Sequence, residues 1–499
     1  MQTNSRRLVK NTIFSLLARG AELGAGFITI ILAARYLGIE IFGEYAFIRA
    51  IVFMLAPMIN FGIERILIRD ISIRKSRASV LVCSGLALNL SVGISLCIIA
   101  IIVSHIFRET AFFPISVFAI AIIAQMLQVM TKTISSVYVA YEKIYFDLIA
   151  TIISRSLIII LFIIIAYCDM NGKYFFHAFA FANATAFIFS IIILEMKFIR
   201  PVWSINSGLI AYLIKQSFPI AVAVFMIQGY NNIFVFFLKL LRDTIEVSLF
   251  QAPQRIIQQC LVLPRSFLFA YVPTLSRMAQ EGQSLSTLRD TYRRMVKYIF
   301  IFTLPASVFV TAFADEFVFL AFGSDFSKAA APLKILIWAI NLLFINMLLD
   351  FILTSMRKQN ILIVSNGLCL AVSSALGFIF VQKYGYFGAC WATLLSYVIL
   401  VITNFYFVSK HLGLIPVHLI VLKPILCCSV LGAILLEYSD NIHMVILIIT
   451  GLLIYTVLLF LMRTFTHEEL SFLKHGVIIK LKRRLNGLFC FPEKNNKRR

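Results

Sequence analysis

About fourteen long apolar segments follow one another along this chain, with short connections between them. They lie near 12–37, 42–63, 79–104, 112–138, 144–167, 174–194, 211–238, 245–272, 295–314, 329–355, 360–381, 386–408, 418–437 and 442–463. Each is long enough to cross a bilayer, which takes about 20 apolar residues in a helix. Inside the bilayer every backbone polar group must be bonded within its own segment, as a helix allows. The pattern therefore predicts an all-α polytopic membrane protein with about fourteen transmembrane helices.

The composition agrees with this prediction and excludes several other classes of protein. Only 14% of the residues are charged, whereas a soluble domain carries about 25%. The net charge of +22 would indicate nucleic acid in a soluble protein, but here the charge lies mainly in short loops and in the C-terminal tail. None of the nine cysteines belongs to a C-x-x-C or Cys/His cluster. We therefore expect no nucleic-acid partner, no metal and no cofactor.

The basic residues of the loops are distributed unevenly between the two sides of the membrane. About thirty fall on the side of the N-terminus and of alternate loops, against about six on the other side. Cytoplasmic loops are the ones enriched in Lys and Arg. The distribution predicts that both termini are cytoplasmic, which requires an even number of spans.

Changes in composition divide the chain into four parts. A polar stretch from Arg200 to Gly208, with Pro201 and Asn206, separates two sets of six spans. The predicted parts are an N-terminal six-helix lobe over 1–200, a second six-helix lobe over 201–408, two additional transmembrane helices over 409–466, and a tail over 467–499. The tail alternates apolar and basic residues and is predicted to be an amphipathic helix on the anionic cytoplasmic leaflet.

A polar stripe on an otherwise apolar segment indicates where the functional site lies. Gln251, Gln254, Arg255, Gln258 and Gln259 recur at spacings of three and four, which places them on one helical face. Placing an Arg at the bilayer centre costs from about 2.5 kcal/mol upward. We expect this face to line a hydrated, positive cavity.

The same pattern occurs in the first half of the chain. Phe42-Gly-Glu-Tyr-Ala-Phe-Ile-Arg49 resembles Val247-Ser-Leu-Phe-Gln-Ala-Pro-Gln-Arg255, and both runs open the second span of their half. Internal repeats are typical of transporters, whose sites lie at the interface between the repeats. Neither Arg49 nor Arg255 has an acidic residue three or four positions away on its own helix, so both are predicted to face the cavity.

Other polar residues at membrane depth have two interpretations each. Arg19 and Glu22 lie one helical turn apart and either neutralise each other or face the cavity. Lys132 either contacts the substrate or extends its stem to the cytoplasmic interface. Asn346 is more typical of a hydrogen bond between helices than of a ligand. Glu22 and Asp350 are the candidate residues for coupling transport to a cation.

The balance of deep charges favours an anionic substrate. Deep basic residues outnumber deep acidic ones, and the planar guanidinium group forms paired bonds to phosphate. The neighbouring Gln and Asn amides suit sugar hydroxyls, because both groups donate and accept hydrogen bonds. A phosphate and a sugar together at membrane depth indicate a lipid-linked saccharide.

Four short runs resemble the polysaccharide-unit (O-antigen) flippases, a family of the multidrug/oligosaccharidyl-lipid/polysaccharide exporter superfamily. The runs are Ser15-Leu-Leu-Ala-Arg-Gly-Ala-Glu22, Leu32-Ala-Ala-Arg-Tyr-Leu-Gly38, Phe42-Gly-Glu-Tyr45 and Val272-Pro-Thr-Leu-Ser-Arg277. The resemblance implies two six-helix lobes around a central cavity, two additional helices, and alternating access in the bacterial cytoplasmic (inner) membrane. It also implies that an undecaprenyl-pyrophosphate-linked oligosaccharide moves to the periplasmic leaflet during O-antigen, and hence lipopolysaccharide, biosynthesis.

The resemblance also implies site residues and partners. Arg19, Arg49 and Arg255 occupy places similar to those of the cavity arginines of the lipid II flippase, on the first, second and eighth helices. The run Asn231-Asn-Ile-Phe234 departs from the family's Asn-Arg-Ile-Asp run. The implied partners are the lipid-linked oligosaccharide, membrane lipids, a polysaccharide polymerase and a chain-length regulator.

Two other functions fit a polytopic chain. A drug/cation antiporter of the same fold would use uncompensated carboxylates in the cavity, for which Glu22, Glu64 and Asp350 are available. A membrane enzyme, such as a polysaccharide polymerase or a lipid-dependent glycosyltransferase, would need a sizeable external loop with catalytic groups. The external loops near Arg108 and Asp315 are short, so we expect a transporter and not an enzyme.

Overall fold

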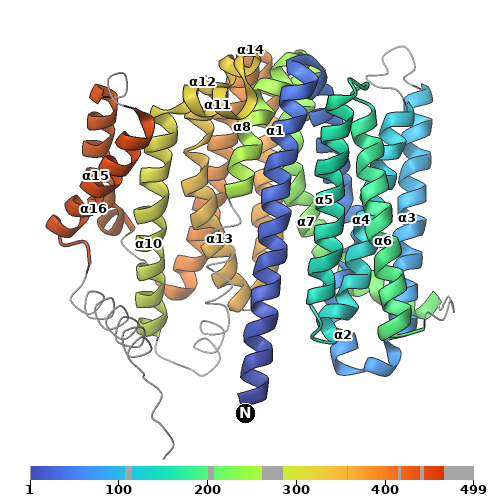
Figure 1. The fold of residues 1–499 in the computed structure, drawn as a ribbon. Helices are drawn as coiled ribbons and strands as arrows, with labels where there is room; N and C mark the ends of the chain where they lie inside the picture. The colour runs from blue at the N-terminus through green and yellow to red at the C-terminus, as the bar shows by residue number, and fades with distance from the viewer. Residues whose placement is uncertain are drawn as a thin grey trace, which may run out of the picture. The chain divides into compact units, whose positions relative to one another are not determined.

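The computed structural model describes residues 2–106, 115–200, 207–260, 285–356, 358–413, 417–438 and 443–465. Within these ranges all regular structure is helical (Figure 1). The elements are α1 (Gln2–Asn60), α2 (Ile63–Ile73), η1 (Lys75–Arg77), α3 (Ala78–Ile106), α4 (Ile115–Ala140), α5 (Tyr145–Tyr167), α6 (Tyr174–Lys197), α7 (Ser207–Leu241), α8 (Thr244–Cys260), α10 (Leu285–Ala312), α11 (Ala314–Phe322), η2 (Ser324–Ala329), α12 (Ala330–Leu336), α13 (Ala339–Ser355), α14 (Gln359–Leu412), α15 (Val417–Tyr438) and α16 (Met444–Leu461). The predicted tail over 467–499 and the run Val272–Arg277 lie outside the described residues.

Two of the helices are too long for a single crossing and are broken at a glycine. A helix of 59 residues would extend about 90 Å, three times the hydrocarbon thickness. The chain of α1 turns back at Gly38 (φ 68°), and that of α14 at Gly385 (φ 57°). These φ values lie in the left-handed region that glycine adopts without steric cost. Each of the two helices therefore provides two crossings.

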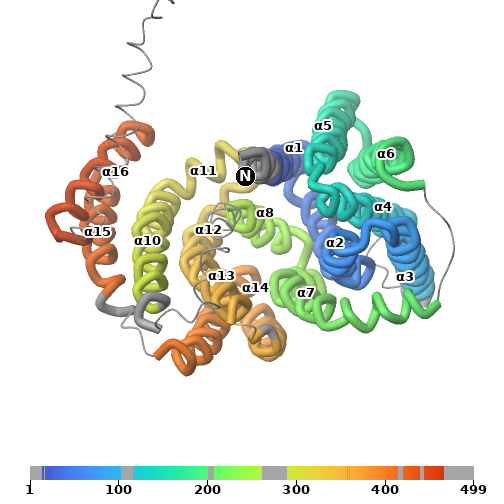
Figure 2. The backbone as a smooth tube through the Cα atoms, turned by 90° about the horizontal axis from the view of Figure 1, so that it is seen from below, coloured from blue at the N-terminus to red at the C-terminus, as the bar shows by residue number. Residues whose placement is uncertain are grey.

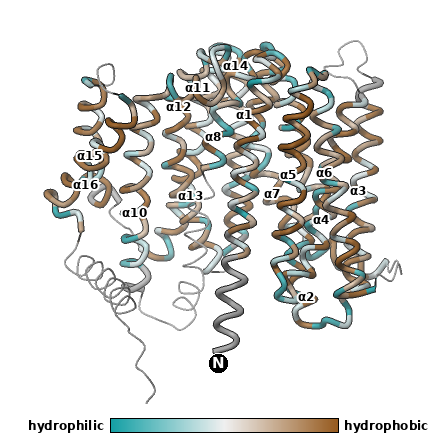
Figure 3. Tube along the Cα trace, in the orientation of Figure 1, coloured by the Kyte–Doolittle hydropathy of each residue, from teal (hydrophilic) through white to brown (hydrophobic). Residues whose placement is uncertain are grey.

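The number of crossings confirms the predicted fold. Ten helices of the described residues are long and apolar enough to span a membrane. Counting α1 and α14 twice, and adding the bent α12–α13 pair and α8, gives about fourteen crossings. Figure 3 shows hydrophobic residues along the length of these helices, and many large apolar side chains on them are exposed, as expected for lipid contact. The protein is a multi-pass membrane protein.

One segment predicted as a loop is helical. Residues 63–73 form α2, which buries Ile63, Ile66, Leu67 and Ile71 against α4 and α3. The buried residues recur at three- and four-residue spacing, which is the pattern of an amphipathic helix. The basic residues of this segment had assigned it to a loop, although such residues also occupy the polar face of a surface helix.

The segment predicted near 329–355 as one span is a broken helix. Its two halves, Ser324–Leu336 and Ala339–Ser355, are bent by 46°. Backbone bonds shorten to three-residue spacing at the break, from Trp338 N–H to Ile335 O (3.3 Å) and from Ile340 N–H to Ile337 O (3.1 Å). Such tightening redirects the helix axis without a proline.

The chain divides into two compact units. The first comprises Met1–Met295 and Phe313–Ile415, and the second comprises Val296–Ala312 and Pro416–Arg499. In the second unit Tyr455 donates a hydrogen bond to Ile301 O (3.0 Å), which joins α16 to α10. In the first unit α1 packs against α5 and α8, as the view along the helices shows (Figure 2). The lobe boundaries at residues 200 and 408 stay a prediction.

Candidate functional site

Two predicted arginines, one on α1 and one on α8, meet at a single aromatic ring in the first unit. The guanidinium carbon of Arg49 lies 5.2 Å from the ring centroid of Phe53, and that of Arg255 lies 5.6 Å from the same centroid. Arg49 and Phe53 are one turn apart on the second half of α1, which packs directly against α8. The two runs that the sequence related to each other therefore converge in space.

Aromatic groups provide most of the remaining contacts of Arg49. Its Nη1 donates a hydrogen bond to the hydroxyl of Tyr45 (2.8 Å), and its guanidinium also lies over the ring of Phe179 on α6 (5.2 Å). Each such cation–π contact contributes about 0.5–2 kcal/mol, depending on how well it is desolvated. These contacts compensate part of the cost of burial and leave the positive charge in place.

Arg255 has hydrogen-bonding capacity to spare. Its Nη1 donates to the side-chain oxygen of Gln258 (2.9 Å), whereas its Nη2 is buried without a hydrogen-bond partner. Within the described part of the chain, neither Arg255 nor Arg49 forms an ion pair with a carboxylate. A buried donor without a partner carries a desolvation cost of about 1–3 kcal/mol, and more when charged. An anion at this point would remove that cost.

The glutamines of α8 do not all share the environment of Arg255. Gln254 donates from Nε2 to the backbone oxygen of Asn231 on α7 (2.9 Å), so it joins two helices. Gln251 is 0% exposed, and neither its amide nitrogen nor its amide oxygen has a hydrogen-bond partner. Contact of Gln251 with a substrate would therefore require α8 to move relative to its neighbours. Gln258 is half-buried and orients Arg255.

The predicted acidic and basic residues of the first spans form a network between helices. Glu22 accepts a hydrogen bond from Arg155 Nη2 on α5 (3.0 Å), and the charges of Lys132 and Arg19 also act on it. Lys132 pairs with Asp147 on α5 (3.3 Å). Glu22 thus takes its hydrogen-bonded partner from a neighbouring helix and not from Arg19. Lys132 links α4 to α5 at a half-buried position.

Asp350 lies in a separate cluster on α13 and α14. Asn404 donates from Nδ2 to Asp350 Oδ1 (2.9 Å) and to Asn346 Oδ1 (2.7 Å), and Asn346 donates to Asp350 Oδ2 (3.1 Å). The bond between Asn404 and Asn346 confirms the prediction that Asn346 joins helices. In the described ranges Asp350 has no cationic side chain within ion-pair distance.

Several residues of these clusters were not predicted from the sequence. Tyr45, Phe53 and Phe179 hold Arg49, and Asn404 holds Asp350. Phe residues are abundant in every span (47 in the chain), so no local signal distinguished these two. Their position one turn from Arg49 marks Tyr45 and Phe53, because residues four apart face each other on a helix.

A family model described as "Polysaccharide biosynthesis protein" matches residues 8–279 of the chain, which is more than half of its length. The chain belongs to this polysaccharide biosynthesis family. The matched region contains Arg19, Glu22, Arg49, Lys132 and the whole of α8. Asp350 lies beyond it.

Solved transporter structures share the fold of this family member. The lipid II flippase MurJ, in an inward closed conformation, superposes with a TM-score of 0.70 at 16% identity and covers 89% of this chain and 97% of its own. An inward-facing multidrug resistance MATE family transporter of the MOP superfamily gives 0.68 at 15% identity, over 78% and 94%. The Vibrio cholerae MATE transporter VcmN gives 0.57 at 16% identity, over 84% and 99%. No match was found among curated protein sequences.

The common fold relates the site to the architecture of the family. At these identities the likeness concerns the fold alone, which is that of membrane transporters and of a flippase. It confirms the predicted superfamily and the all-α polytopic arrangement. The arginines at Phe53 and the cluster around Asp350 are features of this chain's own side chains.

Proposed function

We propose that this member of the polysaccharide biosynthesis family is a flippase. It translocates an undecaprenyl-pyrophosphate-linked oligosaccharide, such as an O-antigen repeat unit, from the cytoplasmic to the periplasmic leaflet by alternating access. The observation that carries the proposal is the pair Arg49 and Arg255, two buried guanidinium groups at one ring without a neutralising carboxylate in the described residues. A pyrophosphate supplies the negative charges and acceptors that such a pair lacks.

The geometry of the two arginines supports an anion over a cation as substrate. Stacking on Phe53 uses the face of each guanidinium group, whereas hydrogen bonds to phosphate use its edge. The edge of Arg255 retains a free buried donor at Nη2. Gln258 lies beside it and offers an amide that suits sugar hydroxyls. In this proposal Arg19, Lys132, Gln251 and Gln254 also contact the substrate during the cycle.

The transport step needs an energy source, and we propose Asp350 for it. Its carboxylate is held by two amides and has no cationic partner in the described residues. A buried carboxylate surrounded by amide oxygens and nitrogens suits a proton or a small cation. Glu22, the other candidate, already has Arg155 as partner, so binding of a cation there would compete with a formed ion pair.

The location and partners follow from the same proposal. The membrane is the cytoplasmic (inner) membrane of a bacterium, with both termini in the cytoplasm. The substrate would be supplied by glycosyltransferases on the cytoplasmic face and used by a polysaccharide polymerase with its chain-length regulator. The protein itself makes and breaks no covalent bond in this scheme.

Deletion of the coding sequence tests the proposal. Loss of the protein should leave the undecaprenyl-linked repeat unit in the cytoplasmic leaflet, and surface polysaccharide should disappear. The measurement is the accessibility of the lipid-linked unit to a glycan-modifying enzyme added outside spheroplasts. If the unit remained fully accessible from outside in the deletion strain, the proposal would be wrong.

A drug/cation antiporter is the second candidate, since MATE transporters share the fold. Its support is the carboxylate of Asp350, whereas the arginines at Phe53 disfavour a cationic drug through like-charge repulsion. A drug-sensitivity screen of the deletion strain separates the two functions. Increased sensitivity to cationic drugs with normal surface polysaccharide would favour the antiporter.

A further inference from the structure

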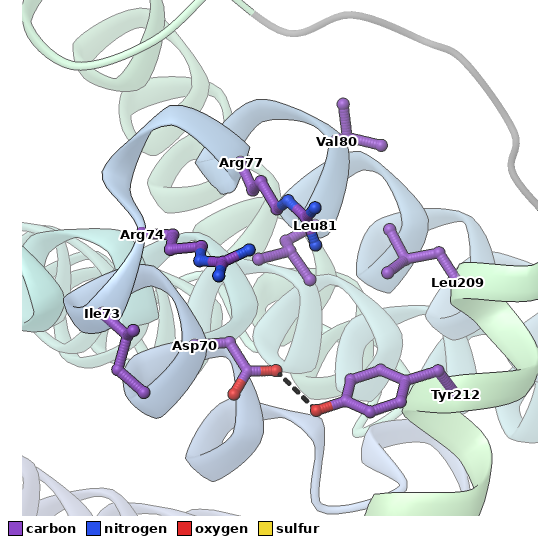
Figure 4. A pocket seen from close by; sticks show the side chains of 8 residues that line it. All are labelled: Asp70, Ile73, Arg74, Arg77, Val80, Leu81, Leu209 and Tyr212. Carbon is purple, nitrogen blue, oxygen red and sulfur yellow. Dashed lines mark hydrogen bonds between the residues drawn. The ribbon is translucent and has the colours of Figure 1, made fainter.

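A pocket of about 620 Å³ lies at one end of the spans, where α2, η1 and α3 face the first turns of α7 (Figure 4). It lies outside the clusters described above and shares no residue with them. Arg74 and Arg77 line it from the α2–α3 side, across from Tyr212 on α7. Pockets that hold small molecules have volumes of about 300–1,000 Å³. The space therefore suits a ligand of head-group size.

The acidic residue of the pocket is already neutralised. Asp70 accepts a hydrogen bond from Arg69 Nε at Oδ1 (2.8 Å) and another from the Tyr212 hydroxyl at Oδ2 (3.1 Å). Arg69 also donates from Nη2 to the Tyr212 hydroxyl (3.0 Å). These three side chains form a closed triangle that joins α2 to α7. The charge of Asp70 is thus compensated by Arg69, which does not line the pocket.

The two lining arginines, in contrast, keep their charge and their donors. Within the described residues the side chains of Arg74 and Arg77 form no hydrogen bond and no ion pair, and both are exposed. Their spacing of three residues across the α2–η1–α3 turn brings both to the same wall. Two guanidinium groups directed at one space match the non-bridging oxygens of a phosphodiester.

The rest of the wall is apolar and lies at head-group depth. Leu81 is buried, Val80 and Leu209 are half-buried, and Ile73 is 72% exposed at the end of α2. The span that contains α2 ends at Ile73, and the next span begins at Lys75. The pocket is therefore where the polar and apolar parts of a phospholipid meet. A free phosphate would use the arginines and leave the apolar wall uncovered.

We propose that this pocket binds an anionic phospholipid of the surrounding leaflet, with its phosphodiester on Arg74 and Arg77 and its acyl chains along Ile73, Val80 and Leu209. The site differs from the substrate site in location and in residues. Basic pockets between spans are typical sites for anionic head groups. Because α2–α3 and α7 both line the pocket, a bound lipid bridges the first half of the chain to the start of the second.

Lipid-dependent unfolding of the purified full-length protein tests this site. The protein is delipidated in detergent and unfolded by heat with dioleoylphosphatidylglycerol, with dioleoylphosphatidylcholine or with inorganic phosphate, and retained lipid is identified by native mass spectrometry. Phosphatidylglycerol should raise the unfolding temperature and stay bound, and phosphatidylcholine should do neither. In the R74Q/R77Q variant the affinity for phosphatidylglycerol should fall roughly ten- to a hundredfold, as expected for lost charge-assisted hydrogen bonds.

A matched variant controls for the loss of charge. K143Q/K215Q removes two positive charges from exposed positions of the same predicted face, outside the pocket, and should retain wild-type affinity. R74K/R77K, which keeps the charge, should retain part of the affinity and serves if the Gln variant fails to fold. Equal loss in K143Q/K215Q would overturn the proposal, because binding would then follow net charge. Equal stabilisation by inorganic phosphate would overturn the assignment to a lipid.

Discussion

At the scale of residues, the buried arginines are held by rings instead of carboxylates. An ion pair would cancel the charge of Arg49, whereas the faces of Phe53 and Phe179 stabilise it without cancelling it. Arg255 shares the ring of Phe53, so two like charges are kept near each other in a poorly hydrated place. This arrangement costs free energy in the empty protein, and an anion between the two groups would recover it.

Replacing either arginine should remove that anion site. We expect R49A and R255A each to reduce surface polysaccharide at least tenfold, because each loses charge-assisted hydrogen bonds worth about 1.5–3 kcal/mol apiece. R49K and R255K should rescue only in part, since Lys cannot form the paired bonds of the planar fork. The measurement is surface polysaccharide at equal protein level in the membrane. K173A, at an exposed position, is the control, and near-normal polysaccharide in both Ala variants would identify the arginines as structural.

The Asp350 cluster leads to a separate prediction. D350N keeps the shape of the side chain and removes its charge, so binding of a cation should be lost while the fold is kept. Transport of a labelled lipid-linked oligosaccharide in proteoliposomes should fall at least tenfold and no longer respond to a sodium or proton gradient. D315N alters an exposed carboxylate that pairs with Lys334 (2.8 Å) and should leave the response unchanged. An unaltered gradient response in D350N would exclude Asp350 from coupling.

At the scale of elements, the contact between α1 and α8 depends on a glycine. A Cβ added to Gly43 would fall against the backbone oxygen of Thr244 and 2.7 Å from the Ser248 hydroxyl. Ser248 also donates a hydrogen bond to Ile39 O. The two helices therefore approach closely just above Arg49 and Arg255 in sequence, and the glycine permits that approach.

Alanine at position 43 should separate the two helices. Overpacking of this kind costs about 1–3 kcal/mol, and it would widen the spacing between the helices that carry the two arginines. We expect G43A to lower the unfolding temperature and to reduce surface polysaccharide. G20A is the matched variant on the same helix, because no atom lies within 4 Å of a Cβ at Gly20. Equal behaviour of G43A and G20A would contradict the prediction.

Which elements the sequence could predict depends on what determines them. The spans follow from apolar length, a local property, and their number was predicted correctly. The helix α2 and the break between Leu336 and Ala339 were missed, because charge and hydropathy within one segment do not record which neighbour it packs on. The partners of Glu22 and Lys132 were missed for the same reason, since both come from α5. The convergence of Arg49 and Arg255 was expected from the internal repeat, but the ring between them was not.

At the scale of the whole molecule, the distribution of basic residues predicts the orientation in the membrane. Fluorescent protein fused to either terminus should fluoresce, because both ends are expected in the cytoplasm, whereas alkaline phosphatase fused there should be inactive. Fusions after Lys173 and after Lys328, in loops of the opposite side, should give the reverse result. Active phosphatase at either terminus would contradict the predicted orientation and the even number of spans.

The two arginines beside Phe53 belong to helices far apart in the sequence, and neither helix alone offers more than half of a diphosphate clamp. The strength of that clamp is consequently a function of helix separation. A cargo gripped while α1 and α8 touch would be loosened as soon as they part, with no titration and no bond cleavage. Release would be built into the opening movement itself.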